Sequence, residues 1–191
     1  MKSVIKCPYY YFASALSKEM CEGVIQAGLE LSVAEAKVND GLETHEDLNL
    51  RKGKVSWFEK TSPVHSVINN FVHQANYAAK WHFTLDSSEK VQFAQYENEG
   101  DFYSWHRDGD VSRNVWRKLS VTVQLSDPND YEGGKFEMKH IWNDTLLEMD
   151  KETTLQGTII VFPSMLPHRV TPVTNGTRYS LVQWFSGPDF V

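Results

Sequence analysis

The sequence predicts a mainly β domain, an antiparallel sandwich or barrel such as a jelly roll, with helices packed on its outside. Two observations support this fold class. Two helical patterns lie within about the first 90 residues, and from about residue 90 the chain consists of short runs rich in Val, Ile, Thr and aromatic residues, separated by turn residues. A chain of 191 residues is long enough for one sizeable core and too short for two ordinary domains. We therefore expect a single domain over residues 1–191.

Two helices are expected in the first part. Ser17 is a typical N-cap for a helix with apolar positions at Met20, Cys21, Val24 and Ile25. Ser62 followed by Pro63 marks a second helix start. Behind it an apolar stripe runs to residue 79, and the opposite, solvent-exposed face is expected to carry His65, Asn69, His73, Asn76 and Lys80.

The strands are expected in six places. Residues 55–58 form a short strand after a charged, glycine-containing segment, 39–54, which we expect to be a loop. The later strands are expected over 91–96, 119–125, 134–138, 157–162 and 178–185. Leu119, Val121 and Val123 alternate with polar residues, which is typical of a half-buried strand. Turn residues separate these runs at 127–130, 132–134 and 174–176.

Composition excludes several classes of protein. Aromatic residues make up 13% of the chain, too many for a disordered one, and the net charge of −6 disfavours non-specific nucleic-acid binding. No apolar run approaches the length of a membrane helix, and the first residues lack the apolar region of a secretory signal. Cys7 and Cys21 cannot form a zinc site alone. Two reduced thiols are expected, and with them a cytoplasmic location.

Two of the seven histidines stand out. His45, His65, His73, His82 and His140 are expected to have ordinary structural roles. His106 and Asp108 form an H-x-D pattern, and in an extended chain residues i and i+2 point to the same side. His168, in a Pro-framed turn after the 157–162 strand, is the candidate third ligand. Two His and one Asp form a facial triad, which leaves metal positions open and is typical of non-haem Fe(II) oxygenases.

Arg178 follows His168 by ten residues, through a tight-turn signal at Asn175 and Gly176. We expect this turn to place Arg178 beside the strand that presents His168. Its planar guanidinium suits a dicarboxylate whose other end binds the metal. The alternative is that Arg178 pairs with a protein carboxylate on the surface.

At this point the sequence resembles the Fe(II)/2-oxoglutarate-dependent dioxygenases, specifically their prolyl 4-hydroxylase-like branch. The matching stretches occur in the family's order at 95–96, 100–108, 131–134, 157–164 and 168–184. The resemblance implies a double-stranded β-helix, a jelly-roll motif core over about 91–187, supported by the helical part over about 1–90. It implies Fe(II) at His106, Asp108 and His168, with O₂ as co-substrate.

The resemblance also implies roles for four further residues. 2-Oxoglutarate would chelate the iron, and its distal carboxylate would meet Arg178 and Tyr96. Tyr103 matches a tyrosine on the substrate side, and Trp184 matches an aromatic residue beside the reacting centre. Taken from the sequence alone, Tyr96 and Trp184 could equally be core residues of the barrel. Ascorbate is the expected reductant.

The expected activity is hydroxylation of a prolyl residue in a peptide or protein, coupled to decarboxylation of 2-oxoglutarate to succinate and CO₂. Hydroxylation of a free amino acid or another small molecule is an alternative, and an iron-free jelly-roll binding module is another. No membrane partner is expected, and nucleic acid is disfavoured. Residues 109–118 could form a lid hinged at Gly109, whose Arg113, Arg117 and Lys118 would favour acidic residues beside the target proline.

Overall fold

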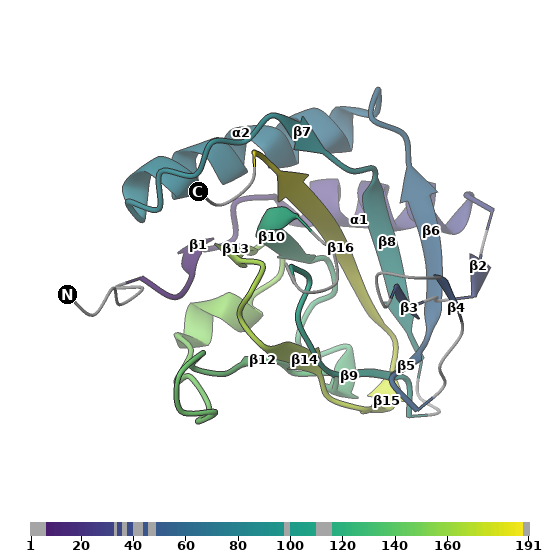
Figure 1. Ribbon diagram of the computed structural model, residues 1–191. Coiled ribbons are helices and arrows are strands. Elements are labelled where there is room, and N and C mark those ends of the chain that lie inside the picture. Colours follow the sequence, from purple (N-terminus) through teal and green to yellow (C-terminus); the bar gives the residue numbers. More distant parts are fainter. Residues whose placement is uncertain are drawn as a thin grey trace.

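A computed structural model describes residues 7–32, 34–35, 38–39, 44–45, 49–97, 100–109 and 116–188 of the chain. Two helices cover one face of a large antiparallel sheet, and a smaller sheet lies against its other face (Figure 1). The mainly β fold with outer helices is therefore confirmed. The sheets are not closed into a continuous barrel, so the arrangement is that of a sandwich.

Both expected helices are present and begin where their caps predict. Helix α1 spans Lys18–Leu29, and the Ser17 side chain accepts a hydrogen bond from the backbone of Met20. Helix α2 spans Pro63–Ala78, with Ser62 as N-cap and Pro63 in the first turn. A short 3₁₀ helix, η2, spans Lys151–Thr154.

The large sheet has the strand order β1-β13-β10-β16-β8-β6-β2, with β7 paired to β16. Its strands are β1 (Tyr10–Phe12), β2 (Ala34–Glu35), β6 (Lys54–Phe58), β7 (Ser87–Ser88), β8 (Val91–Tyr96), β10 (Arg117–Gln124), β13 (Ile159–Pro163) and β16 (Arg178–Ser186). The smaller sheet has the order β12-β14-β9-β5, formed by Phe136–Met138, His168–Val170, Phe102–His106 and Arg51–Lys52. Two short pairs complete the described strands: β3 (Val38–Asn39) with β4 (Thr44–His45), and β11 (Tyr131–Gly133) with β15 (Val173–Gly176).

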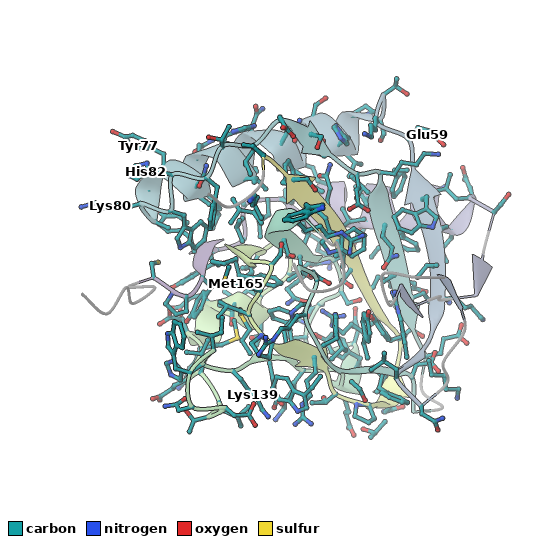
Figure 2. All side chains as sticks on the ribbon, viewed as in Figure 1. Glu59, Tyr77, Lys80, His82, Lys139 and Met165 are labelled. Atoms are coloured by element: carbon teal, nitrogen blue, oxygen red, sulfur yellow. The ribbon has the colours of Figure 1, made fainter. Side chains whose placement is uncertain are left out.

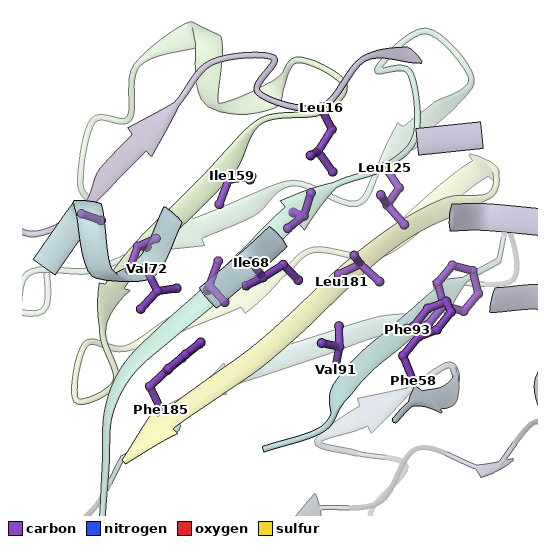
Figure 3. Packing of buried hydrophobic residues seen from close by; sticks show 14 of the residues in the cluster. Leu16, Phe58, Ile68, Val72, Val91, Phe93, Leu125, Ile159, Leu181 and Phe185 are labelled. Atoms are coloured by element: carbon purple, nitrogen blue, oxygen red, sulfur yellow. The ribbon is translucent and has the colours of Figure 1, made fainter. Parts of the chain in front are cut away.

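The main hydrophobic core lies between the helices and the large sheet (Figure 3). Ile68 and Val72 of α2 and Cys21 of α1 pack against alternate residues of the central strands. Those strand residues include Val91, Phe93, Leu119, Val121, Val123, Ile159, Val161, Leu181 and Phe185. Because this face takes the apolar side chains of β8, β10, β13 and β16, the opposite face of the same strands is left for other residues.

On β10 that opposite face is polar and yet buried, which corrects the expectation of a half-exposed strand. In β10, Ser120, Thr122 and Gln124 alternate with the core residues and are at most 4% exposed. The smaller sheet covers them, so the alternation in the sequence separates an apolar core from a polar interior rather than core from solvent. This polar interior is where the candidate site lies.

The segment 39–54 is not wholly a loop as expected. It contains β4, β5, the last residue of β3 and the first residue of β6, and its Arg51 is buried at 4% exposure. The sequence did not indicate β3, β4 and β5 because each is only two residues long. β3 and β4 pair with each other, whereas Arg51 of β5 pairs with Tyr103 and Lys54 of β6 pairs with Gln95.

Helix α2 is also buried on more than its apolar stripe. His65 and Asn76, expected on the solvent face, are both 8% exposed. The segment 81–88 covers this side: His65 Nε2 lies 3.0 Å from Ser88 Oγ, and the Asn76 side chain makes two hydrogen bonds with the backbone of Phe83. His73 is exposed as expected. At the far end of α2, Tyr77, Lys80 and His82 point outward from the fold (Figure 2).

The turn at Asn175 and Gly176 differs from the expected tight hairpin. Gly176 has the positive φ of a turn residue, 71°, but the two strands on either side of it, β15 and β16, do not pair with each other. β15 pairs with β11, and β16 pairs with β8 and β10. Arg178 therefore lies on the large sheet, not beside the strand that presents His168. The two residues meet because the two sheets face each other. None of the described helices is long and apolar enough to cross a bilayer.

Two glycines of α1 provide a matched test of this packing. A Cβ at Gly28 would lie 2.7 Å from ring atoms of Phe93, whereas a Cβ at Gly23 meets nothing within 4 Å. We expect Gly28→Ala to lower the free energy of unfolding by about 1–3 kcal/mol because Phe93 is confined in the core. Gly23→Ala should raise it by about 0.5–1 kcal/mol, since Ala is the better helix former. Urea unfolding measures both, and equal effects from the two variants would contradict this packing.

Candidate active site

Three metal-ligating side chains converge between the two sheets. His106 ends β9, Asp108 follows two residues later, and His168 begins β14, where it is the direct strand partner of His106. Asp108 Oδ1 lies 3.5 Å from His106 Nε2, and Asp108 Oδ2 lies 3.3 Å from His168 Nε2. One ligand atom from each residue falls within 4.8 Å of the others. The three residues expected from the sequence are thus brought together.

Backbone contacts orient both imidazole rings. His106 Nδ1 lies 2.8 Å from the Ser104 carbonyl oxygen, and His168 Nδ1 lies 2.9 Å from that of Leu166. Each Nδ1 donates its proton to the carbonyl, which leaves Nε2 as the nitrogen that faces the other ligands. Burial, followed by the neighbouring His168, lowers the pKa of His106 to about 4. The ring is therefore neutral near pH 7, as a metal ligand must be.

Two buried serines hold the carboxylate of Asp108. Ser120 Oγ donates to Asp108 Oδ2 at 2.7 Å, and Ser164 Oγ lies 2.8 Å from Ser120 Oγ. Because Ser120 gives its one proton to the carboxylate, Ser164 must donate to Ser120. Burial alone raises the pKa of Asp108, but the interactions with His168 and His106 outweigh it and hold that pKa well below its usual range. Asp108 is ionised and fixed in position.

This donor set fits a divalent transition metal. Two imidazoles and one carboxylate supply three ligands, and no other cluster of this kind occurs among the residues that the structure describes. Three protein ligands leave coordination positions for other molecules, as in the 2-His-1-carboxylate sites of non-haem iron oxygenases.

A buried arginine lines the same cavity. Arg178 is 1% exposed, so the alternative of a surface ion pair is wrong. Its Nη2 donates to Gln124 Oε1 at 2.8 Å and its Nη1 donates to Ser180 Oγ at 3.1 Å, while its Nε has no partner. Within the described residues no carboxylate pairs with it. Tyr96, 3% exposed, lies alongside, with its ring 5.6 Å from the Arg178 Cζ atom.

A buried guanidinium that has no counter-charge is an anion site. The expected partner, a dicarboxylate that also reaches the metal, therefore fits the residues that are present.

The two expected substrate-side aromatics also line this cavity. The ring of Tyr103 stacks on His106 at 3.5 Å between centroids. Trp184 is 6% exposed, and its Nε1 has no hydrogen-bond partner. Its ring centroid lies 6.2 Å from that of the partly exposed Trp57. Burial raises the pKa of Tyr103, so its hydroxyl stays protonated and can donate. An unpartnered indole N–H, a protonated tyrosine hydroxyl and an aromatic surface thus line the same cavity as the candidate metal ligands.

Two of the three basic residues expected in a cationic lid, Arg117 and Lys118, are held within the fold. Arg117 stacks over Trp184 at 3.9 Å and pairs with both carboxylate oxygens of Glu89, at 2.6 and 2.8 Å. Lys118 is 4% exposed and already interacts within the fold. Gly109 is buried, and a Cβ there would lie 2.5 Å from the Arg117 carbonyl oxygen, so its role is close approach rather than hinging. Arg113, with the rest of 110–115, lies outside the described residues.

Sequence reasoning missed several residues of the site. Arg51 and Gln92 line the cavity, and Ser120 and Ser164 support Asp108. Polar residues alternating along β10 were the available signal for Ser120. Nothing in the sequence distinguishes Arg51 from its charged neighbours.

Comparison with known proteins assigns the class. Residues 91–186, half of the chain, match the model of the 2OG-Fe(II) oxygenase superfamily. The chain belongs to this family, which confirms the resemblance to the Fe(II)/2-oxoglutarate-dependent dioxygenases. The family implies Fe(II), 2-oxoglutarate and O₂.

The similar curated sequences are PKHD-type hydroxylases. The chain is 43% identical over 86 residues to a PKHD-type hydroxylase of Synechococcus sp. (strain CC9605), covering 44% of this chain and 36% of that protein. It is 29% identical over 163 residues to a PKHD-type hydroxylase of Prochlorococcus marinus, covering 85% and 64%. The chain thus spans between about a third and two-thirds of the length of these curated relatives.

Solved structures share the fold. A Pseudomonas putida prolyl-4-hydroxylase aligns with a TM-score of 0.69 at 19% identity, covering 96% of this chain and 95% of that one. A Trichoplax adhaerens prolyl hydroxylase, in complex with a hypoxia inducible factor peptide fragment, aligns with a TM-score of 0.72 at 15% identity, covering 95% and 84%.

The serine pair can be tested through metal binding. We expect Ser120→Ala to weaken Fe(II) binding by about 10–100-fold, because Asp108 loses the hydroxyl that orients it. Ser120→Thr keeps the hydroxyl and should retain most of the affinity. Ser126→Ala removes another buried hydroxyl, one that bonds the Tyr179 and Thr177 backbone instead, and is the matched control. Anaerobic Fe(II) titration provides the measurement. Unchanged affinity in Ser120→Ala would contradict the role given to this serine.

Proposed function

We propose that this protein is an Fe(II)- and 2-oxoglutarate-dependent hydroxylase that acts on a prolyl residue in a peptide or protein and releases succinate and CO₂. One observation carries the proposal. A buried arginine without a counter-charge, Arg178, lines the same cavity as the His106, Asp108 and His168 ligands. A metal and a dicarboxylate can therefore be held together in one enclosed space.

His106, Asp108 and His168 would hold the Fe(II), and Arg178 and Tyr96 would hold the far carboxylate of 2-oxoglutarate. The bound iron, 2-oxoglutarate and O₂ supply the oxidising chemistry. The protein positions these groups and excludes water. Gln124 and Ser180 hold the Arg178 guanidinium, and the Ser164–Ser120 pair holds Asp108.

The substrate side supports a prolyl target. Tyr103 and Trp184 present their rings in the same cavity as the metal ligands, Trp184 also offers an unpartnered N–H, and Trp57 extends this aromatic surface toward solvent. A pyrrolidine ring packs well on such a surface, and an extended proline peptide loses little entropy on binding. We also propose ascorbate as the reductant and the cytoplasm as the location.

Two alternatives to a prolyl hydroxylase can be compared with this site. A free amino acid or another small molecule would use the same cavity and the same cofactors. An iron-free binding module is disfavoured, because all three metal ligands and Arg178 are present and ordered around one cavity.

The 2-oxoglutarate anchor predicts an order of effects. We expect Arg178→Ala to raise the KM for 2-oxoglutarate far more than Tyr96→Phe does. Losing a buried charge pair costs about 2–5 kcal/mol, and losing one neutral hydrogen bond costs about 0.5–1.5 kcal/mol. Succinate formation at varied 2-oxoglutarate gives both values. An unchanged KM in Arg178→Ala would place the anchor elsewhere.

The substrate class is tested by product analysis. Proline-containing peptide libraries, free proline and other amino acids are incubated with the protein, Fe(II), 2-oxoglutarate and ascorbate, and mass spectrometry records the gain of one oxygen atom. Asp108→Ala is the control for uncatalysed oxidation. Oxygen gained on peptidyl proline supports the proposal. Oxygen gained only on a free amino acid or another metabolite would replace it by the small-molecule alternative.

A further inference from the structure

A second buried arginine lines the candidate active site. Arg51 begins β5 and is 4% exposed, and its direct strand partner is Tyr103, the tyrosine that stacks on His106. Its Cζ atom lies 4.6 Å from the Tyr103 ring centroid. Arg51 and His106 thus contact the same Tyr103 ring, and both residues line the same cavity.

The contacts of Arg51 fix its position without neutralising its charge. Nη2 donates to Gln92 Oε1 at 2.7 Å, and Nε has no hydrogen-bond partner. Within the described part of the chain no carboxylate forms an ion pair with it. The arrangement repeats that of Arg178, which is held by Gln124 Oε1 and also has an unpartnered Nε. The cavity therefore contains two buried guanidinium groups, each held by a neutral amide.

The charges within this cavity do not balance when the proposed cofactors are bound. Among the described lining residues, Asp108 carries one negative charge, and Arg51 and Arg178 carry two positive charges. A divalent metal and dianionic 2-oxoglutarate cancel each other. One positive charge therefore remains uncompensated. Because 2-oxoglutarate is assigned to Arg178, the guanidinium without an anion is that of Arg51. An unpaired charge in a buried site is costly, which favours one more anion at Arg51.

We propose that Arg51 binds a carboxylate of the substrate, on the hydroxylated residue or on the residue next to it. This inference rests on the proposed function and narrows its substrate class to acids. The carboxylate could belong to a free amino acid, to the last residue of a peptide, or to an acidic side chain beside the target. An uncharged internal proline segment would leave Arg51 unpaired.

The test compares each acid with its amide, which has nearly the same shape and no charge. The protein is loaded with Fe(II) and 2-oxoglutarate without O₂, and binding is measured by calorimetry. Three pairs separate the sources: proline and prolinamide, acetyl-Gly-Pro and its amide, and internal peptides with Pro-Glu or Pro-Gln. A fourth pair, cyclopentanecarboxylate and its carboxamide, tests the anion site with no proline present.

We expect the acid to bind about tenfold or more tightly than the amide in the cyclopentane pair and in at least one proline pair. Arg51→Gln should remove this difference, and Arg51→Lys should keep part of it. Lys52→Gln removes the same charge from the neighbouring, half-exposed position of β5 and should leave the difference intact. The affinity for 2-oxoglutarate should be unchanged in Lys52→Gln and should fall far less in Arg51→Gln than in Arg178→Ala.

Equal binding of acid and amide in the wild-type cyclopentane pair would overturn the proposal, and so would an acid preference that survives in Arg51→Gln. The comparison of the cyclopentane acid with its amide in the wild-type protein tests the proposal even if Arg51→Gln fails to fold. An acid preference in the cyclopentane pair with no binding of any proline compound would keep the anion site and reject the prolyl substrate instead.

Discussion

The carboxylate of Asp108 connects the two sheets on which the site is built. On one side it contacts His106 and His168 from the smaller sheet, and on the other it accepts a hydrogen bond from Ser120 of the large sheet. A buried carboxylate is stable only when such partners surround it. Its position therefore depends on both sheets being correctly placed, and a metal bound there would hold them together. The serine behind it links this carboxylate to the end of β13 through Ser164.

The inner face of the large sheet acts as a scaffold for charges. Arg178 of β16 is held by Gln124 of the neighbouring β10, and Arg51 is held by Gln92 of β8. A glutamine amide can fix a guanidinium in place while leaving its charge available to a ligand. A carboxylate at either position would instead neutralise the arginine and close the anion site. The pairing of each arginine with a neutral residue is thus what makes the cavity suited to acids.

The helices allow the interior between the sheets to be polar, although they do not touch it. They take up the apolar side chains on the outer face of β8, β10, β13 and β16, and so form the main hydrophobic core of the domain (Figure 3). The inner face can then carry Ser, Thr, Gln and Arg without the domain losing its core. Two residues expected on the solvent side of α2, His65 and Asn76, are instead used to fasten the segment 81–88 to the helix.

The sequence by itself determined the two helices, the central strands and the candidate metal ligands. Helix starts at Ser17 and Ser62, the central strands, and the set of His106, Asp108, His168 and Arg178 are local patterns or ordered motifs, and they can be read along the chain. Only the tertiary structure decided whether the polar side of a strand faces solvent or the second sheet. Ser120, Gln92 and Arg51 look like ordinary strand or loop residues, because the sequence does not say that a second sheet covers them. The same limit explains why Arg178 was placed beside His168 along the chain, when in the folded protein the two come from opposite sheets and meet across the cavity.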